Sequence, residues 1–353
     1  ITGAGGATLS VAPGKTLTVG DISGIGNIVN KGTLIKIGDE TVAWPFDNAS
    51  TGTTTVSSGT LKVARVETVS ENLYGFKPDG VNHEVRVATG ATFDLNGEKD
   101  LTVSVRLAES ATFANYGAAI DYYKMQTVQI ILDGDATAAF SNDFGLIAPG
   151  YKETKLDLGE NTLTLDGAGK NFWLCNTTIS GTGTILVKKG TLWATQRDSV
   201  GSECTVSIAS EGGLNLGKNL TVKNFVNNGT ISGSATLTVL GELAPGNPVP
   251  KLTLADGAQV KATGTEQTVS TTFSASGTIT VDASAISAAA LHEAGETGVA
   301  VLTVPAAFNP LNAKWDVSGE QVPDTRRKWR TDVGGTTKTL YVAKPSGLMV
   351  IIR

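Results

Sequence analysis

Two pairs of aspartates are the first residues whose type and spacing could support catalysis. Asp133 and Asp135 stand two positions apart in ILDGDA, so in a strand both carboxylates would lie on one face. Asp94 and Asp157 hold the same place in two copies of a repeated phrase, so they could stack on adjacent coils. Two facing carboxylates can hydrolyse a glycosidic bond. Aspartate beside glycine is also a common turn residue, and we favour turns at these positions.

Other catalytic and metal-binding residue types are scarce. His83 precedes a strand and His292 lies in a predicted helix, and neither has sequence neighbours suited to a triad or a metal site. We expect surface or capping roles for both. The sequence has no calcium-binding Gly-Asp repeat and no phosphate-binding glycine loop. We therefore predict no enzyme, no cofactor and no metal site, with a polysaccharide lyase or glycoside hydrolase as the least favoured alternative.

Aromatic residues with polar neighbours fit a binding site better. A ring packs on the apolar face of a sugar, while polar side chains bind the hydroxyls at its edge. Trp173 in KNFWLCN and Trp193 in GTLWATQRD could be equivalent on successive coils, with rings stacked about 5 Å apart as a floor for a linear glycan. Gln196 and Arg197 would add polar contacts. Packing in the core is the alternative for each tryptophan. The other candidate sugar-binding rings are Trp44, Tyr116, Tyr122, Tyr123 and Tyr151.

Composition excludes several classes of protein. Charged residues make up 17% of the 353-residue chain and the net charge is −5, which argues against a nucleic-acid partner. No apolar run reaches about 18 residues, so we expect no membrane span. The chain opens without a basic, apolar leader, so we predict that it belongs to a larger multidomain protein. Its richness in Thr, Gly and Asn suits a secreted or cell-surface bacterial protein. Cys175 and Cys204 could form a disulfide or remain as buried thiols.

Two short phrases recur along the chain and predict the fold. Alternating apolar and polar residues make half-buried strands, and the Gly and Asn turns between them leave no room for a crossover helix. From LNL at Leu214 to ISG at Ile231 is 17 residues, and from LDL at Leu156 to ISG at Ile179 is 23. Coils of roughly 20 residues indicate an all-β, right-handed parallel β-helix. The phrases are FDLNGEKDLTV (93–103), LDLGENTLTL (156–165) and LNLGKNLTV (214–222), and ISGIGNIV (22–29), ISGTGTILV (179–187) and ISGSATLTV (231–239).

The repeats divide the chain into a solenoid and a cap. We predict β-helix repeats over 1–281, with aromatic-bearing loop inserts mainly within 40–151. We predict a non-repeat C-terminal cap over 282–353, which would cover the bare strand edges of the last coil. It contains a helix at 282–295, capped by Ser284 and stopped by Gly295, and a hairpin at 339–352. The insert aromatics include Trp44 with Phe46, Tyr74 with Phe76, Phe113 and Phe144.

The repeated phrases, with ELAPGNP at 242–248 after one copy, resemble autotransporter-associated β-strand repeats. That resemblance implies a β-helical scaffold in a bacterial surface or secreted protein. The chain is also similar in character to β-helical carbohydrate-binding modules of enzymes that degrade plant polysaccharides, some of which bind xylan. Neither resemblance transfers a binding residue to this sequence.

The favoured functional hypothesis is a non-catalytic module that binds a plant cell-wall polysaccharide through exposed aromatics on the β-helix. A xylan-like glycan is one candidate ligand. The alternative is a surface adhesin or passenger stalk whose solenoid has a structural role.

Overall fold

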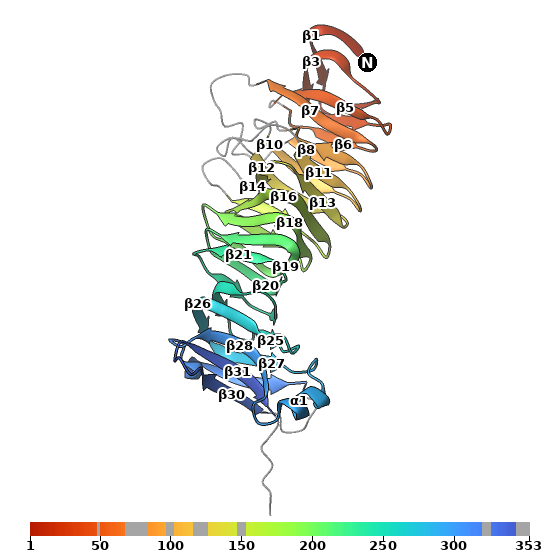
Figure 1. Ribbon diagram of the computed structural model, residues 1–353. Coiled ribbons are helices and arrows are strands. Elements are labelled where there is room, and N and C mark those ends of the chain that lie inside the picture. The colour runs from red at the N-terminus through yellow and green to blue at the C-terminus, as the bar shows by residue number, and fades with distance from the viewer. Residues whose placement is uncertain are drawn as a thin grey trace, which may run out of the picture.

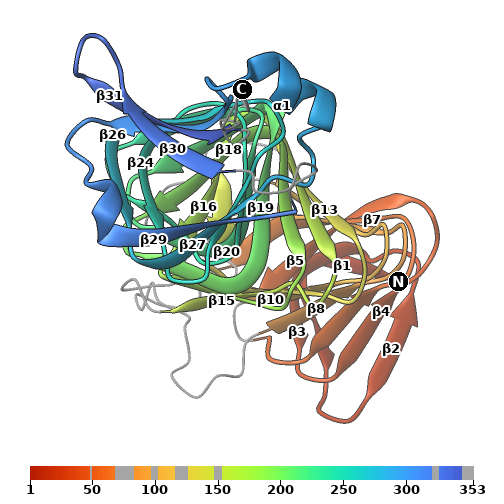
Figure 2. The same cartoon turned by 90° about the horizontal axis from the view of Figure 1, so that it is seen from below.

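A computed structural model describes residues 1–47, 50–67, 83–96, 102–115, 126–146, 153–319 and 326–343. It is a parallel β-solenoid of about 11 turns, with 65% of residues in strands and 3% in helices. The predicted all-β parallel β-helix is therefore confirmed. The coils stack from the N-terminal end to a small C-terminal sheet, which gives an elongated molecule (Figure 1). Seen from below, the N-terminal coils are displaced to one side of the later ones (Figure 2).

The turns of the solenoid contribute strands to three faces, named A, B and C in the order in which the chain reaches them. Strands within a face pair in parallel, and long strands turn a corner onto the next face, as β19 (Ser199–Leu216) does. Face A contains β2 (Thr16–Val19), β4 (Thr33–Lys36), β6 (Thr53–Val56), β8 (His83–Val87), β10 (Thr102–Leu107), β12 (Gln126–Leu132), β15 (Thr154–Asp157), β17 (Thr177–Ser180), β22 (Leu237–Val239) and most of β24 (Val249–Leu254).

Faces B and C complete the coil. Face B contains β5 (Thr41–Asp47), β7 (Thr60–Glu67), β9 (Thr92–Asp94), β11 (Thr112–Asn115), β13 (Ala136–Phe140), the first parts of β16 (Thr162–Cys175) and β18 (Thr184–Thr195), the end of β20 (Leu220–Asn227), β23 (Glu242–Ala244), β25 (Gln259–Lys261), β27 (Gly277–Asp282) and β29 (Ala313–Ser318). Face C contains β1 (Thr2–Val11), β3 (Ser23–Asn30), β14 (Phe144–Leu146), the ends of β16 and β18, β21 (Thr230–Gly233) and the start of β26 (Gln267–Ala275).

A continuous hydrophobic core runs along the axis inside the three faces. Alternation places every second strand residue inward, and these residues form one buried cluster from Val11 to Val342. Phenylalanines stack within it: the rings of Phe93 and Phe113 are parallel with centroids 6.0 Å apart, and Phe144 packs on Phe113 at 5.4 Å. Each coil therefore buries its apolar residues against the next, which fixes the register of the outward side chains.

The recurring phrases mark corners of the coil. The ISG of one coil pairs with the LDL or LNL of the coil before it, since Leu156 pairs with Ile179 and Leu214 with Ile231. These pairs confirm coil lengths of 23 and 17 residues. LDLGENTLTL turns from face A to face B, whereas LNLGKNLTV turns from face C to face A. The phrase thus encodes a local turn and does not fix one position around the coil.

The C-terminal end carries a sheet that is partly antiparallel. Strand β28 (Val299–Pro305) pairs in parallel with β26 and in antiparallel fashion with β31 (Thr337–Ala343). The other edge of β31 pairs with β30 (Arg326–Thr331). The predicted hairpin over 339–352 is therefore wrong in the pairing of residues 339–343. These residues lie in β31, and both edges of β31 are occupied, by β28 and by β30. Residues 344–353 lie outside the described part of the chain.

The predicted helix over 282–295 is confirmed only in its second half, as α1 (Ala288–Ala294), and Gly295 is its C-cap with φ 55°. The N-cap is Ser287, whose Oγ accepts a hydrogen bond from Ala290 N at 3.1 Å. Ser284 does not cap the helix, because its N–H donates to Asp282 at the end of β27. A 3-10 turn, η2 (Pro310–Asn312), leads into β29. The described residues contain no helix with the length and apolarity that crossing a bilayer requires.

Candidate functional site

One outward column on face B consists of threonine in six strands that pair in sequence. The paired positions run from β5 through β7, β9, β11 and β13 to β16. In each strand the next residue is apolar and buried, as Phe93 follows Thr92 and Phe113 follows Thr112. Because side chains alternate across a strand, burial of that residue holds the threonine outside. The threonine column comprises Thr41, Thr60, Thr92, Thr112, Thr137 and Thr164.

The column lines a groove that follows the solenoid axis. A hollow of about 490 Å³ is bordered by the first five threonines together with Lys62, Asp94 and Ala139. A second hollow of about 460 Å³ shares Thr137 and continues past Thr164. The two hollows form the threonine groove.

The hydroxyl groups of the column have no hydrogen-bond partner among the described residues. Elsewhere outward hydroxyls do pair, as Thr253 and Ser274 do on face A at 2.7 Å. A hydroxyl both donates and accepts, so each threonine of the column can make hydrogen bonds with a polar ligand.

One ion pair lies beside the column and runs along the first hollow of the groove. Lys62 Nζ lies 3.6 Å from Asp94 Oδ2, and the two residues pair in register on β7 and β9. Asp94 is 1% exposed and its Oδ1 accepts a hydrogen bond from Asn96 N at 2.7 Å, so its carboxylate is fixed. The Lys62 side chain is partly exposed. The groove therefore presents a row of neutral hydroxyls, with the Lys62–Asp94 pair beside the first hollow and Glu109 and Asp135 beside the second.

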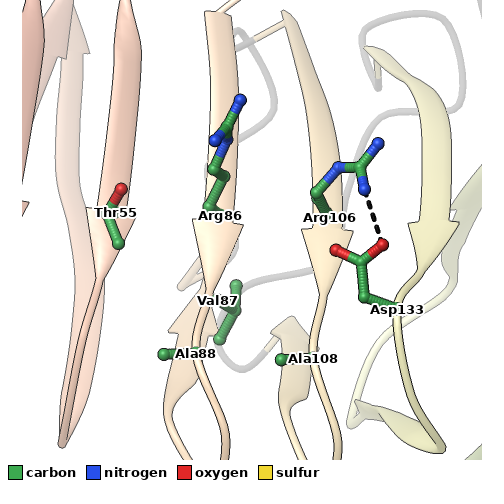
Figure 3. Close-up of a pocket in the computed structure, with 7 residues that line it drawn as sticks. All are labelled: Thr55, Arg86, Val87, Ala88, Arg106, Ala108 and Asp133. Carbon is green, nitrogen blue, oxygen red and sulfur yellow. Dashed lines mark hydrogen bonds and ion pairs between the residues drawn. The ribbon is translucent and has the colours of Figure 1, made fainter.

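Around the corner from the groove, face A carries a second depression, shown in Figure 3. Arg86 of β8 and Arg106 of β10 pair in register, and both side chains stand on the outer surface of the sheet. Thr55 of β6 pairs with Arg86 on the other side. With Val87, Ala88, Ala108 and Asp133 these residues line a hollow of about 480 Å³, named the arginine depression.

Each arginine of the depression has an acidic partner. Arg106 Nη1 donates to Asp133 Oδ1 at 2.5 Å, the contact drawn in Figure 3. Arg86 Nε donates to Glu84 two residues earlier on the same strand. The hydrogen bond to Asp133 raises the pKa of Arg106 above its usual value, and the charges of Asp133, Glu84 and Asp157 add to this effect. The Arg106 guanidinium group is therefore held as a cation.

The predicted tryptophan floor is only partly confirmed. Trp173 and Trp193 do pair in register on β16 and β18. Their rings, however, meet edge to face, with centroids 6.5 Å apart and planes at 74°, so they do not form a flat stack. Trp173 is 4% exposed and Trp193 is half-buried against the core. The expectation of exposed rings is therefore wrong for Trp173, because its side chain packs into the core and against the ring of Trp193.

Other predicted aromatic contacts also lie in the core. Trp44 is fully buried on β5, where its ring packs 6.4 Å from that of Phe46, so it cannot bind a sugar. Phe113 and Phe144, also expected in loop inserts, are buried strand residues. These rings are the inward-facing residues of β-strands. Their clustering with other aromatic residues in the sequence suggested loop inserts instead. Tyr116, Tyr122, Tyr123 and Tyr151, with Tyr74 and Phe76, lie outside the described residues.

Gln196 and Arg197 follow Trp193 at the corner after β18. Gln196 has φ 65° and is half-buried, and Arg197 is exposed with its N–H bonded to Thr195 O at 2.8 Å. They form a turn at the end of the strand. The structure therefore places them beside Trp193 as predicted, where the indole ring is half-buried.

The aspartates of both pairs lie at turns, where their carboxylates bind neighbouring groups. Asp133 and Asp135 flank the turn between β12 and β13, where Asp133 binds Arg106 and Asp135 Oδ1 accepts a hydrogen bond from Thr162 N at 2.7 Å. The turn interpretation is confirmed for both. Asp94 lies on face B and Asp157 on face A, so the suggested stacking of these two is wrong. Each carboxylate instead binds a backbone N–H two residues later, which explains why the phrase recurs at different corners.

His83 is buried, contrary to the expected surface role, whereas His292 is exposed on α1. His83 Nε2 lies 2.8 Å from Thr54 Oγ1, and its ring packs against Phe46. Burial lowers the pKa of His83 to about 4. Cys175 and Cys204 are separate buried thiols. Among the described residues no three His, Cys, Asp or Glu side chains come together as metal ligands.

Sequence reasoning missed both the threonine column and the arginine pair. The signal for the column is present, because a threonine precedes an apolar residue in every face B strand from β5 to β16. The segments between these threonines differ in length, so the sequence alone does not show that the threonines occupy equivalent positions. A small hollow of about 240 Å³ in the C-terminal region, lined by Phe273, Phe308, Asn309 and Asn312 among others, was also not anticipated.

Comparison of the chain with protein families, with curated proteins and with solved structures gives no match. The resemblance to autotransporter-associated repeats therefore remains a prediction based on the repeated phrases alone.

Proposed function

We propose that this chain is a non-catalytic module that binds an extended polysaccharide along the threonine groove. The observation that carries the proposal is the in-register column of six free hydroxyls in one groove. Neighbouring strands lie about 4.8 Å apart, so the column repeats a hydrogen-bonding group at a spacing close to that of sugar rings in an extended chain. A repeating polymer can engage several such groups at once, and many weak contacts then add to useful affinity.

The aromatic residues have a different role in this proposal from the one first expected. The described tryptophans stabilise the solenoid, and hydroxyl groups replace them as the sugar contacts. A plant cell-wall polysaccharide is the proposed ligand class, and the protein is proposed to be secreted or displayed on a bacterial surface. Membership of a larger multidomain protein belongs to the same proposal.

A structural stalk is the second candidate. Its support is the unbroken core from Val11 to Val342, which gives a long and rigid object whose end is covered by the partly antiparallel sheet. A stalk needs no ligand, so it predicts that no polysaccharide is retained and that no groove variant has an effect.

Native affinity electrophoresis tests the proposal against neutral xylan, glucan and mannan, with reducing ends assayed in parallel. We expect retardation by at least one polymer without new reducing ends. The double variant Thr92→Val/Thr112→Val keeps the side-chain shape and removes two hydroxyls, so we expect about tenfold weaker retention.

The matched control is Thr221→Val/Thr238→Val, which changes two outward threonines paired on face A and far from the groove. We expect it to bind as the unchanged protein does. Equal retention of both double variants would reject the groove. New reducing ends would instead point to an enzyme.

A further inference from the structure

Arg86 and Arg106 leave most of their hydrogen-bonding capacity unused. A guanidinium group has five N–H donors. In the described part of the chain the Arg86 side chain contacts only Glu84, through Nε, and the Arg106 side chain contacts only Asp133, through Nη1. Figure 3 shows the two side chains extending from neighbouring strands on the same side of the sheet. The remaining donors therefore border the same depression.

The register of the two strands sets the separation of these groups. Arg86 and Arg106 are directly paired positions, so their backbones lie about 4.8 Å apart. Two like charges so close repel each other unless acids or an anion lie between or beside them. Glu84 and Asp133 each contact one arginine from the flank and hold it in place. Neither acid contacts both arginines, and each guanidinium group keeps donors that a ligand in the depression can engage.

The lining of the depression suits an anionic group that is carried by a larger ligand. Ala88 and Ala108 provide a small apolar surface, and Thr55 adds one hydroxyl at the side. Planar guanidinium groups bind carboxylate and sulfate oxygens through paired hydrogen bonds. Because the chain has a net charge of −5, long-range attraction of a free anion is weak, and the anionic group has to arrive as part of a larger ligand.

We infer that the arginine depression binds an anionic substituent of a polysaccharide, a carboxylate of a uronic acid or a sulfate ester, between Arg86 and Arg106. This inference deepens the proposed function and rests on it. The depression and the threonine groove lie on either side of the corner between faces A and B, since Ala108 lines the first and Glu109 and Ser110 line the second hollow of the groove. A polymer in the groove can therefore place a charged branch or unit around this corner.

The test compares pairs of polymers that differ only in charge. Polygalacturonate is compared with its methyl ester, and the sulfated galactan carrageenan with its chemically desulfated form, by affinity electrophoresis at two salt concentrations. We expect stronger retention by the charged member of at least one pair, and which pair responds separates carboxylate from sulfate. In Arg86→Gln/Arg106→Gln we expect that charged polymer to be retained about tenfold less. Arg86→Lys/Arg106→Lys keeps the charge but loses the planar guanidinium group that makes paired hydrogen bonds. We expect its retention of the charged polymer to lie between those of the unchanged protein and the glutamine variant.

The control is Arg327→Gln, which removes an exposed arginine on β30 that lines neither the depression nor the groove. It should bind as the unchanged protein does. Equal retention of the charged and neutral members, or no effect of Arg86→Gln/Arg106→Gln, would overturn the inference. If the arginine inference fails in this way but Thr92→Val/Thr112→Val still weakens the retention of neutral polymers, the proposed function survives. If the arginine variant loses the charged polymer but the threonine variant changes nothing, the depression is supported and the groove is rejected. Retention of no polymer overturns both.

Discussion

Trp173 and Trp193 occupy the same position on successive turns, and the edge of one indole ring meets the face of the other. The ring centroids are 6.5 Å apart and the planes are inclined at 74°. On the far side of Trp193, a Cβ atom at Gly217 would lie 2.8 Å from its Nε1, so the indole lies close over the next turn. These two rings therefore join three turns of face C.

This packing makes stability, and not ligand binding, the property that depends on Trp173. Truncation of a buried tryptophan removes its packing and leaves a cavity, so Trp173→Ala should lower the free energy of unfolding by about 3–5 kcal/mol. Trp193→Ala should cost less because that ring is half-buried. Urea unfolding followed by circular dichroism measures both. Polysaccharide retention by folded Trp193→Ala should be unchanged. Loss of retention with an unaltered urea midpoint would instead support a sugar site at Trp193.

The fold could be predicted because strand alternation and coil length are both visible in the sequence. Strands such as 16–19 and 251–254 appear where the apolar and polar residues alternate, and the distance from Leu214 to Ile231 is one true coil. The position around the coil could not be predicted in the same way. A phrase such as LDLGENTLTL specifies a turn, and the same turn occurs at different corners.

The candidate site was missed for that reason. Thr60 and Thr92 pair directly although 32 residues separate them, because the segment between β7 and β8 is longer than in other coils. The burial of Trp173 has a second cause. Strand alternation places Phe172 and Trp173 on opposite faces, but it cannot show that a neighbouring ring covers the outer one. Side-chain cover depends on the adjacent coil, which is distant in sequence.

Lys36 forms an internal bridge at one corner of the N-terminal coils. Its side chain is fully buried, and Nζ donates to Glu40 O at 2.8 Å, to Ser58 O at 2.6 Å and to Gly38 O. Burial lowers the pKa of this ammonium group, an effect that Asp39 and Glu40 partly oppose. Lys36→Met should leave these carbonyls without a donor and destabilise the protein by about 2–4 kcal/mol. The urea midpoint measures the change.

A surface lysine serves as the control for that variant. Lys188 Nζ binds Asp166 at 2.8 Å, but its side chain is 54% exposed, so Lys188→Met should change the midpoint little. Equal midpoints for both variants would show that the carbonyl contacts of Lys36 contribute nothing to stability.

The two cysteines should be unreactive in the folded protein. Burial raises the pKa of Cys175 to about 11 and that of Cys204 to about 12, so both thiols stay protonated near neutral pH. A thiol reagent such as DTNB should label neither residue until denaturant is added, and should then label both. Rapid labelling of one thiol in the native protein would contradict its burial, and absence of labelling after unfolding would indicate a disulfide.

His83 should make stability depend on pH. Its pKa is about 4 in the folded protein because burial disfavours the charged ring, whereas an unfolded histidine has a pKa of about 6.5. Between these values the unfolded chain binds a proton that the folded chain does not, so stability should fall as the pH drops from about 6.5 to about 4. The full difference corresponds to about 3 kcal/mol. Urea midpoints across this range measure the loss, and His83→Gln, which cannot titrate, should show a shallower dependence. Parallel curves for the two proteins would show that His83 is not the group responsible, since carboxylates shared by both would then explain the whole slope.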